Sequence, residues 1–449
     1  MTAFGITCYV VTEAKHSAEV YKNTETLSFE DFVQGLMRTN GNKDSVIQTM
    51  YSKLPTNKDG FPNPTGTSLG VLAQRMHIHQ LYPGPNLLAL QQQVLCWIDL
   101  HVTAQSFRES IHPTKHTGPD YIQVPLYKWC SDQLVHLGQH VYFGDLLNEI
   151  DPTLPDAFFV FDELIWKMLY QYPGFLSHDM SVPRARIIAS LESYLRVPQG
   201  QRSDSAAWLI NAMEDEMRAV GIVDNHELAV LMFHLYFAIN TNTRKTAFWF
   251  LTYLLNDPAL MEVVRSETAP AFDGHKVVDP WYLQDAGKCP KVSAIWHETL
   301  RMAGWAASVR LVTRDTVIGG KLLRRGNRVL VPHRLLHFDE TVFGGATTEF
   351  RPERWLSQNG SDLSKDRDLT KSPSWRPFGG GKTICSGRFL AKFTVTTFVA
   401  TLLRRFDVEK VQRHSKFPRA DEGRPVLGIM SIKEEDEFEV RLLPKVVLT

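Results

Sequence analysis

The spacing of apolar and polar residues predicts a chain built mainly from helices. Apolar side chains recur at helical intervals through most of 87–260, with a first long helix expected over 87–100. The longest helical pattern covers 225–256 and stops at the turn sequence "NDP". A further helix is expected over 290–304, between a proline and a glycine, and a last long one over 386–405.

Runs rich in β-branched and aromatic residues predict strands at only a few places. One lies at 5–11, several short ones separated by glycine-containing turns lie within 308–333, and a strand pair is expected around 424–443. The segment 54–86 is rich in Pro, Gly, Asn and Thr and is predicted to be a long loop. Without an internal repeat or a linker, the chain is predicted to be one domain over 1–449, mainly α with small β-sheets.

Charge and cysteine content indicate which partners and which cellular compartment to expect for the protein. Its 49 Lys plus Arg balance 49 Asp plus Glu, which gives no support for a nucleic-acid partner. The best apolar stretch, 228–255, is broken by Arg244 and Lys245, so no membrane-spanning helix is predicted. Five cysteines without a CxxC pair favour a reducing intracellular compartment over a disulfide framework.

The stretch "SWRPFGGGKTICSGRF", residues 374–389, contains "GGGKT" and therefore raises the question of a phosphate-binding loop. That motif requires G-x-x-x-x-G-K-[ST] after a strand, but Arg376 stands where the first glycine is needed. The preceding residues, "LTKSPSW", do not form a hydrophobic strand. The phosphate-loop interpretation is therefore disfavoured.

The same stretch suits a cysteine ligand better. Phe378, Gly381, Cys385 and Gly387 follow the pattern F-x-x-G-x-x-x-C-x-G directly before the last long helix. The amides and dipole of a helix N-terminus favour an anion, so the pKa of Cys385 is expected to be lowered and its thiolate available as a ligand. The alternative is a structural cysteine beside a glycine-rich turn.

These residues resemble the haem-binding signature of the cytochrome P450 family, and two further motifs occur in the family's order. "HETLR" places Glu298 and Arg301 at E-x-x-R on one helix face, and "FRPERW" supplies Arg354. The resemblance implies a P450 fold with haem b (iron protoporphyrin IX) between the long central helix and the helix after the cysteine loop. Cys385 would be the axial ligand of the iron, and Glu298, Arg301 and Arg354 would form a buried charged triad behind it.

Within this family the chain is most similar to the group of sterol 7α- and 12α-hydroxylases and prostacyclin synthase, through "FAINTNTRKTAFWFLTYLLNDP", "TICSGRF" and "RPVLGIM". By this resemblance the sequence is expected to start inside the first sheet, after the position of the family's usual membrane anchor. It also lacks the Trp-x-x-x-Arg motif, and Thr383 replaces the usual Arg or His two residues before the cysteine. The resemblance makes Arg310 the expected propionate-binding residue, with a strand-surface arginine as the alternative. The other expected cofactor-binding residues besides Cys385 are Phe378, Gly381, Thr383 and Gly387.

The resemblance also points to three catalytic positions in the long helix. Relatives usually place an acid and a threonine there, which help to deliver protons to bound dioxygen. Here Thr241 takes the acid position and Asn242 the threonine position, followed by Thr243. An amide can hold a water molecule but is a poor acid. An ordinary polar patch on the helix remains the alternative.

The implied function is that of a haem-thiolate monooxygenase using O2 and electrons from NADPH through a separate cytochrome P450 reductase. The expected substrate is a lipophilic terpenoid, sterol or polyketide-like molecule, with a role in secondary metabolism. By resemblance, the chain is expected to be a monomer at the surface of the endoplasmic reticulum, in contact with the membrane. The predicted substrate-binding residues are apolar and equally compatible with plain core: Phe237, Ala238, Trp305, Ala306, Ile429 and Met430.

Two other functions remain open from the sequence. The altered proton-relay positions keep open a haem-thiolate isomerase or dehydratase, which rearranges a peroxide without O2 or reductase. A non-catalytic haem-binding protein is the third class. Dependence of turnover on reductase separates the first two, and haem binding without any turnover would indicate the third.

Overall fold

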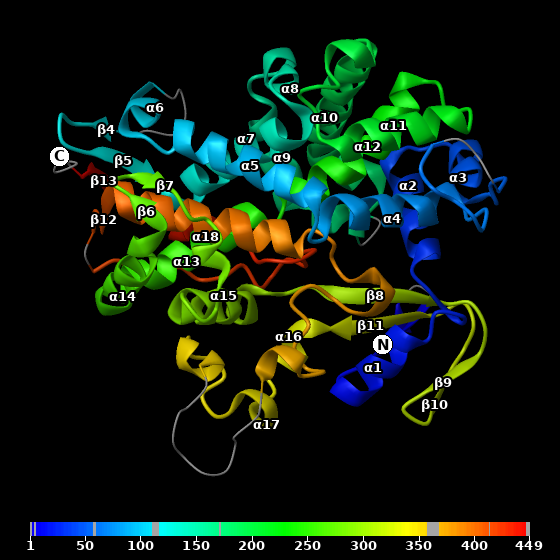
Figure 1. Cartoon of the computed structure of the whole chain (residues 1–449). Coiled ribbons are helices and arrows are strands. Elements are labelled where there is room, and N and C mark those ends of the chain that lie inside the picture. The colour runs from blue at the N-terminus through cyan, green and yellow to red at the C-terminus, as the bar shows by residue number, and fades with distance from the viewer. Residues whose placement is uncertain are drawn as a thin grey trace. The chain divides into compact units, whose positions relative to one another are not determined.

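The structure is a computed structural model (Figure 1). The chain divides into two compact units. Unit 1 comprises Met1–Phe29, Leu95–Asp132 and Asn242–Thr449, and unit 2 comprises Glu30–Val94 and Gln133–Thr241. The residues that the structure describes are 2–3, 6–56, 60–109, 116–169, 172–356, 368–412 and 414–445. The predicted fold class, mainly helical with small sheets, is confirmed.

All the regular elements among the described residues of unit 2 are helices. Its elements are α2 (Glu30–Asn40), α3 (Asp44–Tyr51), α4 (Leu69–Leu81), the first part of α5 (Pro85–His101), most of α7 (Leu126–Phe143), α8 (Leu146–Ile150), α9 (Leu154–Leu169), α10 (His178–Arg196), α11 (Trp208–Ala219) and α12 (Asn225–Asn240). Helix α9 buries Phe158, Phe161 and Ile165, which recur at helical spacing. Phe161 meets Phe233 of α12 edge-on, with ring centroids 5.0 Å apart, so aromatic packing joins these two helices.

The structure corrects the prediction of a loop over 54–86, because α4 lies inside this segment. Leu69, Leu72 and Met76 form the buried face of α4 at i, i+3 and i+7. The turn-forming residues are concentrated before residue 69. There Asn63 Nδ2 donates to the Thr67 carbonyl and Asn63 Oδ1 accepts from the Thr67 N–H, both at 2.9 Å. This local composition led to the prediction of a loop for the whole segment, including the helix that follows.

The long helix predicted over 225–256 is interrupted. It consists of α12 and, in unit 1, α13 (Thr243–Asn256), with Thr241 and Asn242 between them. The Phe237 carbonyl accepts hydrogen bonds from both the backbone N–H of Thr241 (3.0 Å) and its Oγ1 (2.7 Å). A threonine hydroxyl that bonds the carbonyl four residues earlier competes with the helical ladder and bends helices. The periodicity of apolar residues carries no sign of this competition.

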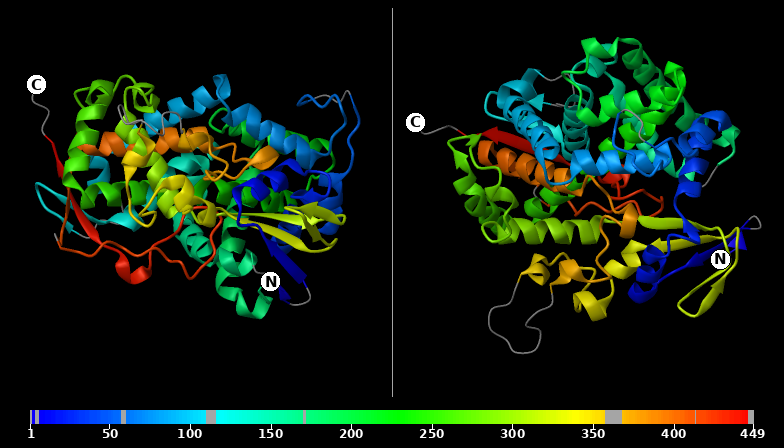
Figure 2. Two further views of the ribbon diagram at one scale, coloured as in Figure 1. Left: turned by 90° about the horizontal axis from the view of Figure 1, so that it is seen from below. Right: turned by 45° about the vertical axis from the view of Figure 1, so that its right-hand side comes forward.

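Unit 1 contains the sheets of the described chain. The largest has the strand order β1 (Thr2–Ala3), β2 (Ile6–Val10), β11 (Arg328–Pro332), β8 (Ala307–Val312) and β3 (Leu27–Ser28). Strand β11 pairs in parallel with β2 and antiparallel with β8. The hairpin of β9 (Thr316–Ile318) and β10 (Lys321–Leu323) extends beyond β8 and β11 (Figure 2).

The predicted strand pair around 424–443 is wrong in one respect. Only β13 (Glu439–Pro444) forms there, and its partners are β12 (Phe406–Lys410) and β5 (Ile122–Pro125), with β4 (His116–Thr117) at the edge. A small two-stranded sheet joins β6 (Phe272–Asp273) to β7 (Lys276–Val277). Strand β5 precedes β13 by more than 300 residues, so no local turn pattern could have predicted their pairing.

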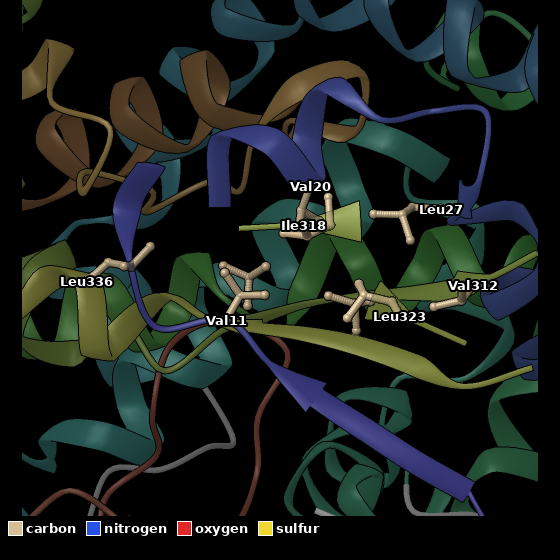
Figure 3. Packing of buried hydrophobic residues seen from close by; sticks show 9 residues of the cluster. Val11, Val20, Leu27, Val312, Ile318, Leu323 and Leu336 are labelled. Carbon is tan, nitrogen blue, oxygen red and sulfur yellow. The ribbon is translucent and has the colours of Figure 1, made fainter. Parts of the chain in front are cut away.

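Helix α1 (Ala14–Lys22) covers the large sheet of unit 1. Val20 of α1 packs with Val312 of β8, Ile318 of β9 and Leu323 of β10 in one buried cluster (Figure 3). Each of these side chains is at most 6% exposed, and burying a side chain of this size contributes roughly 1.5–3 kcal/mol. This core fixes α1, and thereby its last turn, against the sheet.

Helices α13, α14 (Pro258–Thr268) and α15 (Pro290–Ala303) pack against α18 (Arg388–Arg405), which lies beside α13 and α15 in Figure 1. Unit 1 also contains α6 (Ala104–Glu109), α16 (His333–His337) and α17 (Glu340–Phe343). Among the described residues, no helix combines the length and the apolar character needed to span a membrane.

A buried carboxylate on α15 holds the segment after α17. Arg301 Nε and Nη2 bind both oxygens of Glu298 at 2.8 and 2.7 Å, and Arg354 Nε lies 3.3 Å from the same carboxylate. Trp355 Nε1 and the backbone N–H of Arg351 also donate to it, at 2.8 and 2.9 Å. The side chains of Glu298 and Arg301 are fully buried. The structure therefore brings together the three residues of the predicted triad.

Replacing Glu298 by Ala should destabilise unit 1 strongly. The substitution leaves the Arg301 and Arg354 guanidiniums buried without their carboxylate, which costs about 3–5 kcal/mol. The free energy of unfolding in urea and the haem content of the purified protein are the measurements. Glu353→Ala is the matched control, because Glu353 is 62% exposed, pairs with Lys291 at 3.0 Å and should cost less than about 1 kcal/mol. Equal stability of the two variants would contradict the triad's structural role.

Candidate functional site

The loop before α18 is a tight turn that requires glycine. Gly379 and Gly381 have φ angles of +78° and +62°, in the left-handed region. A Cβ on Gly381 would also lie 2.9 Å from the backbone oxygen of Tyr21. The N–H of Cys385 donates to the carbonyl of Phe378 at 2.9 Å and closes the turn. These contacts place Cys385 two residues before Gly387, from which α18 begins.

Cys385 is an exposed residue, but its thiol loses hydration within the fold. Loss of hydration by burial raises its pKa, against the opposing effects of the Gly387 backbone and the Arg388 guanidinium. The prediction of a lowered pKa is therefore wrong for the chain alone, because desolvation outweighs the helix terminus. A thiol in such surroundings ionises when it coordinates a cation.

Arg310 and Thr383, both predicted to bind the cofactor, lie together although 73 residues separate them. Nη2 of Arg310 donates a short hydrogen bond to Thr383 Oγ1, and Nη1 donates to the Val309 carbonyl at 2.7 Å. Arg310 is only 6% exposed, and among the described residues no carboxylate pairs with it. Burial lowers the pKa of its guanidinium. Such a cation suits an anionic ligand.

These observations fit haem. Cys385 is an exposed cysteine in a turn whose glycines permit close approach of a flat group, and Arg310 offers a buried positive charge for a carboxylate. Phe378 lies between them in sequence, with its ring 6.5 Å from that of Trp296 and inclined by 26°. The sulfur, the cation and the aromatic ring all belong to unit 1.

A second group of predicted residues lies around 428–430 of unit 1. Asn242 Oδ1 accepts a hydrogen bond from the N–H of Ile429 at 2.9 Å. The N–H of Trp305 donates to the Gly428 carbonyl at 2.7 Å, and Trp249 Nε1 donates to the Met430 carbonyl at 2.8 Å.

The predicted substrate-binding residues near this loop differ in exposure. Ile429 and Met430 are buried, whereas Trp305 and Ala306 are half-buried. The loop thus brings four predicted substrate-binding residues near predicted catalytic Asn242; Thr243 follows as the first residue of α13.

The other predicted residues lie in unit 2. Thr241 Oγ1 is 2.9 Å from Asp162 Oδ1 of α9, and both side chains are buried. Phe237 is buried in contact with Phe161 and Phe233, as expected of core, while Ala238 is exposed. The hydroxyl of Thr241 is thus engaged within unit 2.

Sequence reasoning missed two residues at these sites. Asp162 is an acid in the apolar stretch "AFFVFDELIWKML", a pattern that could have indicated a buried, paired carboxylate. Tyr21 contacts the Cys385 loop from more than 350 residues away, and no local pattern indicates that contact. The contact between Tyr21 and the loop depends on the packing of α1 on the sheet, which only the structure shows.

Comparisons with known proteins agree with these features. A model of the family described as Cytochrome P450 matches residues 146–440. Among solved structures, the fold is similar to that of the retinoic acid-bound cyanobacterial CYP120A1, with a TM-score of 0.71 and 17% sequence identity. The match covers 98% of this chain and 90% of that chain.

Relatives of known name include members of the predicted group. Cytochrome P450 7A1 of Sus scrofa is 24% identical over 72% of this chain and 67% of its own length. The 5-beta-cholestane-3-alpha,7-alpha-diol 12-alpha-hydroxylase of the same species is 29% identical, covering 71% and 66%. Cytochrome P450 monooxygenase poxD of Penicillium oxalicum is 29% identical, covering 63% and 58%. The chain therefore spans between about three fifths and two thirds of the length of these relatives. The predicted likeness to sterol 7α- and 12α-hydroxylases is confirmed, and the chain belongs to the cytochrome P450 family.

Proposed function

We propose that the protein is a haem-thiolate monooxygenase that oxidises a lipophilic small molecule. The observation that supports this most directly is the turn that carries the exposed residue Cys385, two residues after Thr383, which the buried cation Arg310 contacts. When bound, haem supplies the activation of dioxygen by which one oxygen atom enters a substrate C–H bond. Electrons would come from NADPH through a separate cytochrome P450 reductase.

The chain's own residues would hold the cofactor and control protons and water. Cys385 would ligate the iron, and Phe378 would limit water at the sulfur. Asn242 would hold a water molecule through Nδ2, because its Oδ1 already accepts from Ile429. The backbone hydrogen bonds of the 428–430 loop would keep that amide in one orientation.

The proposed substrate is a sterol, a terpenoid or a polyketide-like metabolite. Relatives include a 12-alpha-hydroxylase of a cholestane diol, a protein named Beta-amyrin 11-oxidase and fungal P450 monooxygenases. Trp305, Ala306, Ile429 and Met430 would supply apolar contact to such a molecule, and rigid rings suit a pocket of apolar side chains. We propose that the chain acts as a monomer at a membrane surface of the endoplasmic reticulum, where lipophilic substrates concentrate.

One observation favours the second candidate, a haem-thiolate isomerase or dehydratase. At the two positions where relatives carry an acid and a threonine, the Thr241 hydroxyl and the Asn242 oxygen are both engaged in hydrogen bonds within the chain. Rearrangement of a peroxide needs no proton relay to dioxygen, so these substitutions would not impair it.

Reconstitution with NADPH and cytochrome P450 reductase distinguishes the two candidates. A library of sterols, terpenoids and polyketides is first screened for substrate-induced changes in the haem spin state. The monooxygenase should form product from the hits only with both NADPH and O2. Product from a hydroperoxide or an alcohol without NADPH would establish the second candidate instead.

Replacing Cys385 by Ser should remove the red-shifted Soret band that carbon monoxide gives with thiolate-ligated ferrous haem. Among the five cysteines, only Cys385 lies in the glycine-rich turn. Cys96→Ser is the control, because Cys96 is exposed on α5 and should leave the band unchanged. Persistence of the band in the Cys385 variant, together with its loss in the Cys96 variant, would move the ligand to Cys96.

Replacing Asn242 by Ala should preserve haem binding but divert electrons from product into hydrogen peroxide. The substitution removes both the Nδ2 donor and the acceptor that fixes Ile429. Asn242→Asp keeps that acceptor and adds a proton-carrying group, so it should be better coupled than the Ala variant. Product and peroxide formed per NADPH are the measurements. Unchanged coupling in both variants would remove Asn242 from the relay.

A further inference from the structure

Two guanidinium groups lie against the ring of Tyr21 in unit 1. The Cζ atom of Arg376 is 5.4 Å from the ring centroid, and that of Arg310 is 5.9 Å from it. Arg376 comes from the turn that leads to Cys385, whereas Arg310 comes from β8. Cation–π attraction to one ring therefore gathers two positive charges from distant segments at one place.

No anion of the described chain neutralises this pair. No salt bridge involves Arg310 or Arg376 among the described residues, and the buried Nε of Arg376 has no hydrogen-bond partner there. The neighbouring titratable group is His333, whose pKa is lowered to about 4, first by burial and then by the charges of Arg376 and Arg310. His333 is thus neutral at physiological pH and does not add or cancel charge.

The position of the Tyr21 ring is fixed on several sides. Its hydroxyl lies 2.9 Å from both Ser308 Oγ and His333 Nε2, and those two atoms are 3.0 Å apart. A Cβ on Gly380 would be 3.0 Å from the ring, so the loop backbone rests directly on it. Because α1 is itself packed on the sheet, Tyr21 cannot move without disturbing both contacts.

Arg310 is buried, and Arg376 is half-buried with a buried Nε. Two positive charges gathered at one ring in this way are unfavourable unless a ligand compensates them. Haem carries two carboxylates, and this chain lacks the family's usual Trp-x-x-x-Arg and has Thr383 in place of a cation. We propose that Arg376 joins Arg310 in binding the two haem propionates, and that Tyr21 is a positioning residue for both arginines. The proposal rests on the proposed haem-binding function and adds residues to it.

The test compares haem with its dimethyl ester, in which both carboxylates are uncharged. The full-length chain is loaded with each compound, and its transfer to apomyoglobin is followed by absorbance. Wild type should lose the ester much faster than haem. Arg376→Met and Arg310→Met should each speed haem loss roughly tenfold, as expected for one charge-assisted hydrogen bond, and leave ester loss unchanged.

Arg265→Met is the matched control. Arg265 is also a partly buried arginine of unit 1, but its Nη1 pairs with Asp407 at 2.6 Å. Its replacement should leave the difference between haem and ester as in wild type. Faster loss of both compounds from the Arg376 variant, or of neither, would overturn the role of Arg376.

Tyr21 variants test positioning. Tyr21→Phe keeps the ring, and Ser308 and His333 retain their bond to each other, so haem loss should remain near wild type. Tyr21→Leu removes the ring, so haem loss should accelerate while ester loss does not. Equal effects of the two Tyr21 substitutions would overturn the positioning role.

Wild-type protein separates this proposal from the proposed function. A wild-type chain that retains haem with a thiolate spectrum but does not discriminate against the ester overturns the proposal alone. A chain that takes up no haem overturns the proposed function as well.

Discussion

The bidentate ion pair between Glu298 and Arg301 is the interaction on which the order of unit 1 depends. Neither side chain is exposed, so each charge relies on the other and on the groups around it. The remaining donors of Arg301 bind the carbonyls of Thr347 at 2.7 Å and Glu349 at 3.1 Å. Arg354 donates to the Ala346 carbonyl, and Ala346 has a φ of +56°, a strained conformation for a residue with a Cβ. Charge pairing on α15 thus holds an otherwise unfavourable backbone path.

The same network reaches the cysteine loop through His337. Arg301 Nη1 lies 3.3 Å from the His337 carbonyl, and His337 Nε2 accepts a hydrogen bond from the N–H of Arg376 at 3.0 Å. Burial, followed by the charges of neighbouring groups, keeps the pKa of His337 far below its usual value, so the ring is neutral and Nε2 can accept. A continuous chain of polar contacts therefore connects the E-x-x-R motif to the turn that carries Cys385.

The polar residues between α12 and α13 form hydrogen bonds that fix neighbouring segments. The hydroxyl of Thr241 contacts Asp162 and Phe237, and Asn242 anchors the backbone at Ile429. Met430 is held on the other side by its N–H bond to Ala303, at 3.0 Å. These bonds hold the apolar 428–430 loop from two sides, and they engage the Thr241 hydroxyl and the Asn242 oxygen within the chain.

The sequence alone determined the elements whose residues interact over one or two turns. Helices α15 and α18, strands β8 and β11 and the order of the three motifs follow from apolar periodicity, from glycine and proline, and from the i,i+3 spacing of Glu298 and Arg301. The tertiary structure decided what depends on distant neighbours. In the folded chain Arg310 donates to Thr383, and Tyr21 contacts the loop that carries Cys385. Strand β13 pairs with β5, and the long helix is interrupted at Thr241. The tertiary structure also raised the pKa of Cys385, because the hydration of a thiol is set by every segment packed around it, whereas a motif records only the residues beside it in the chain.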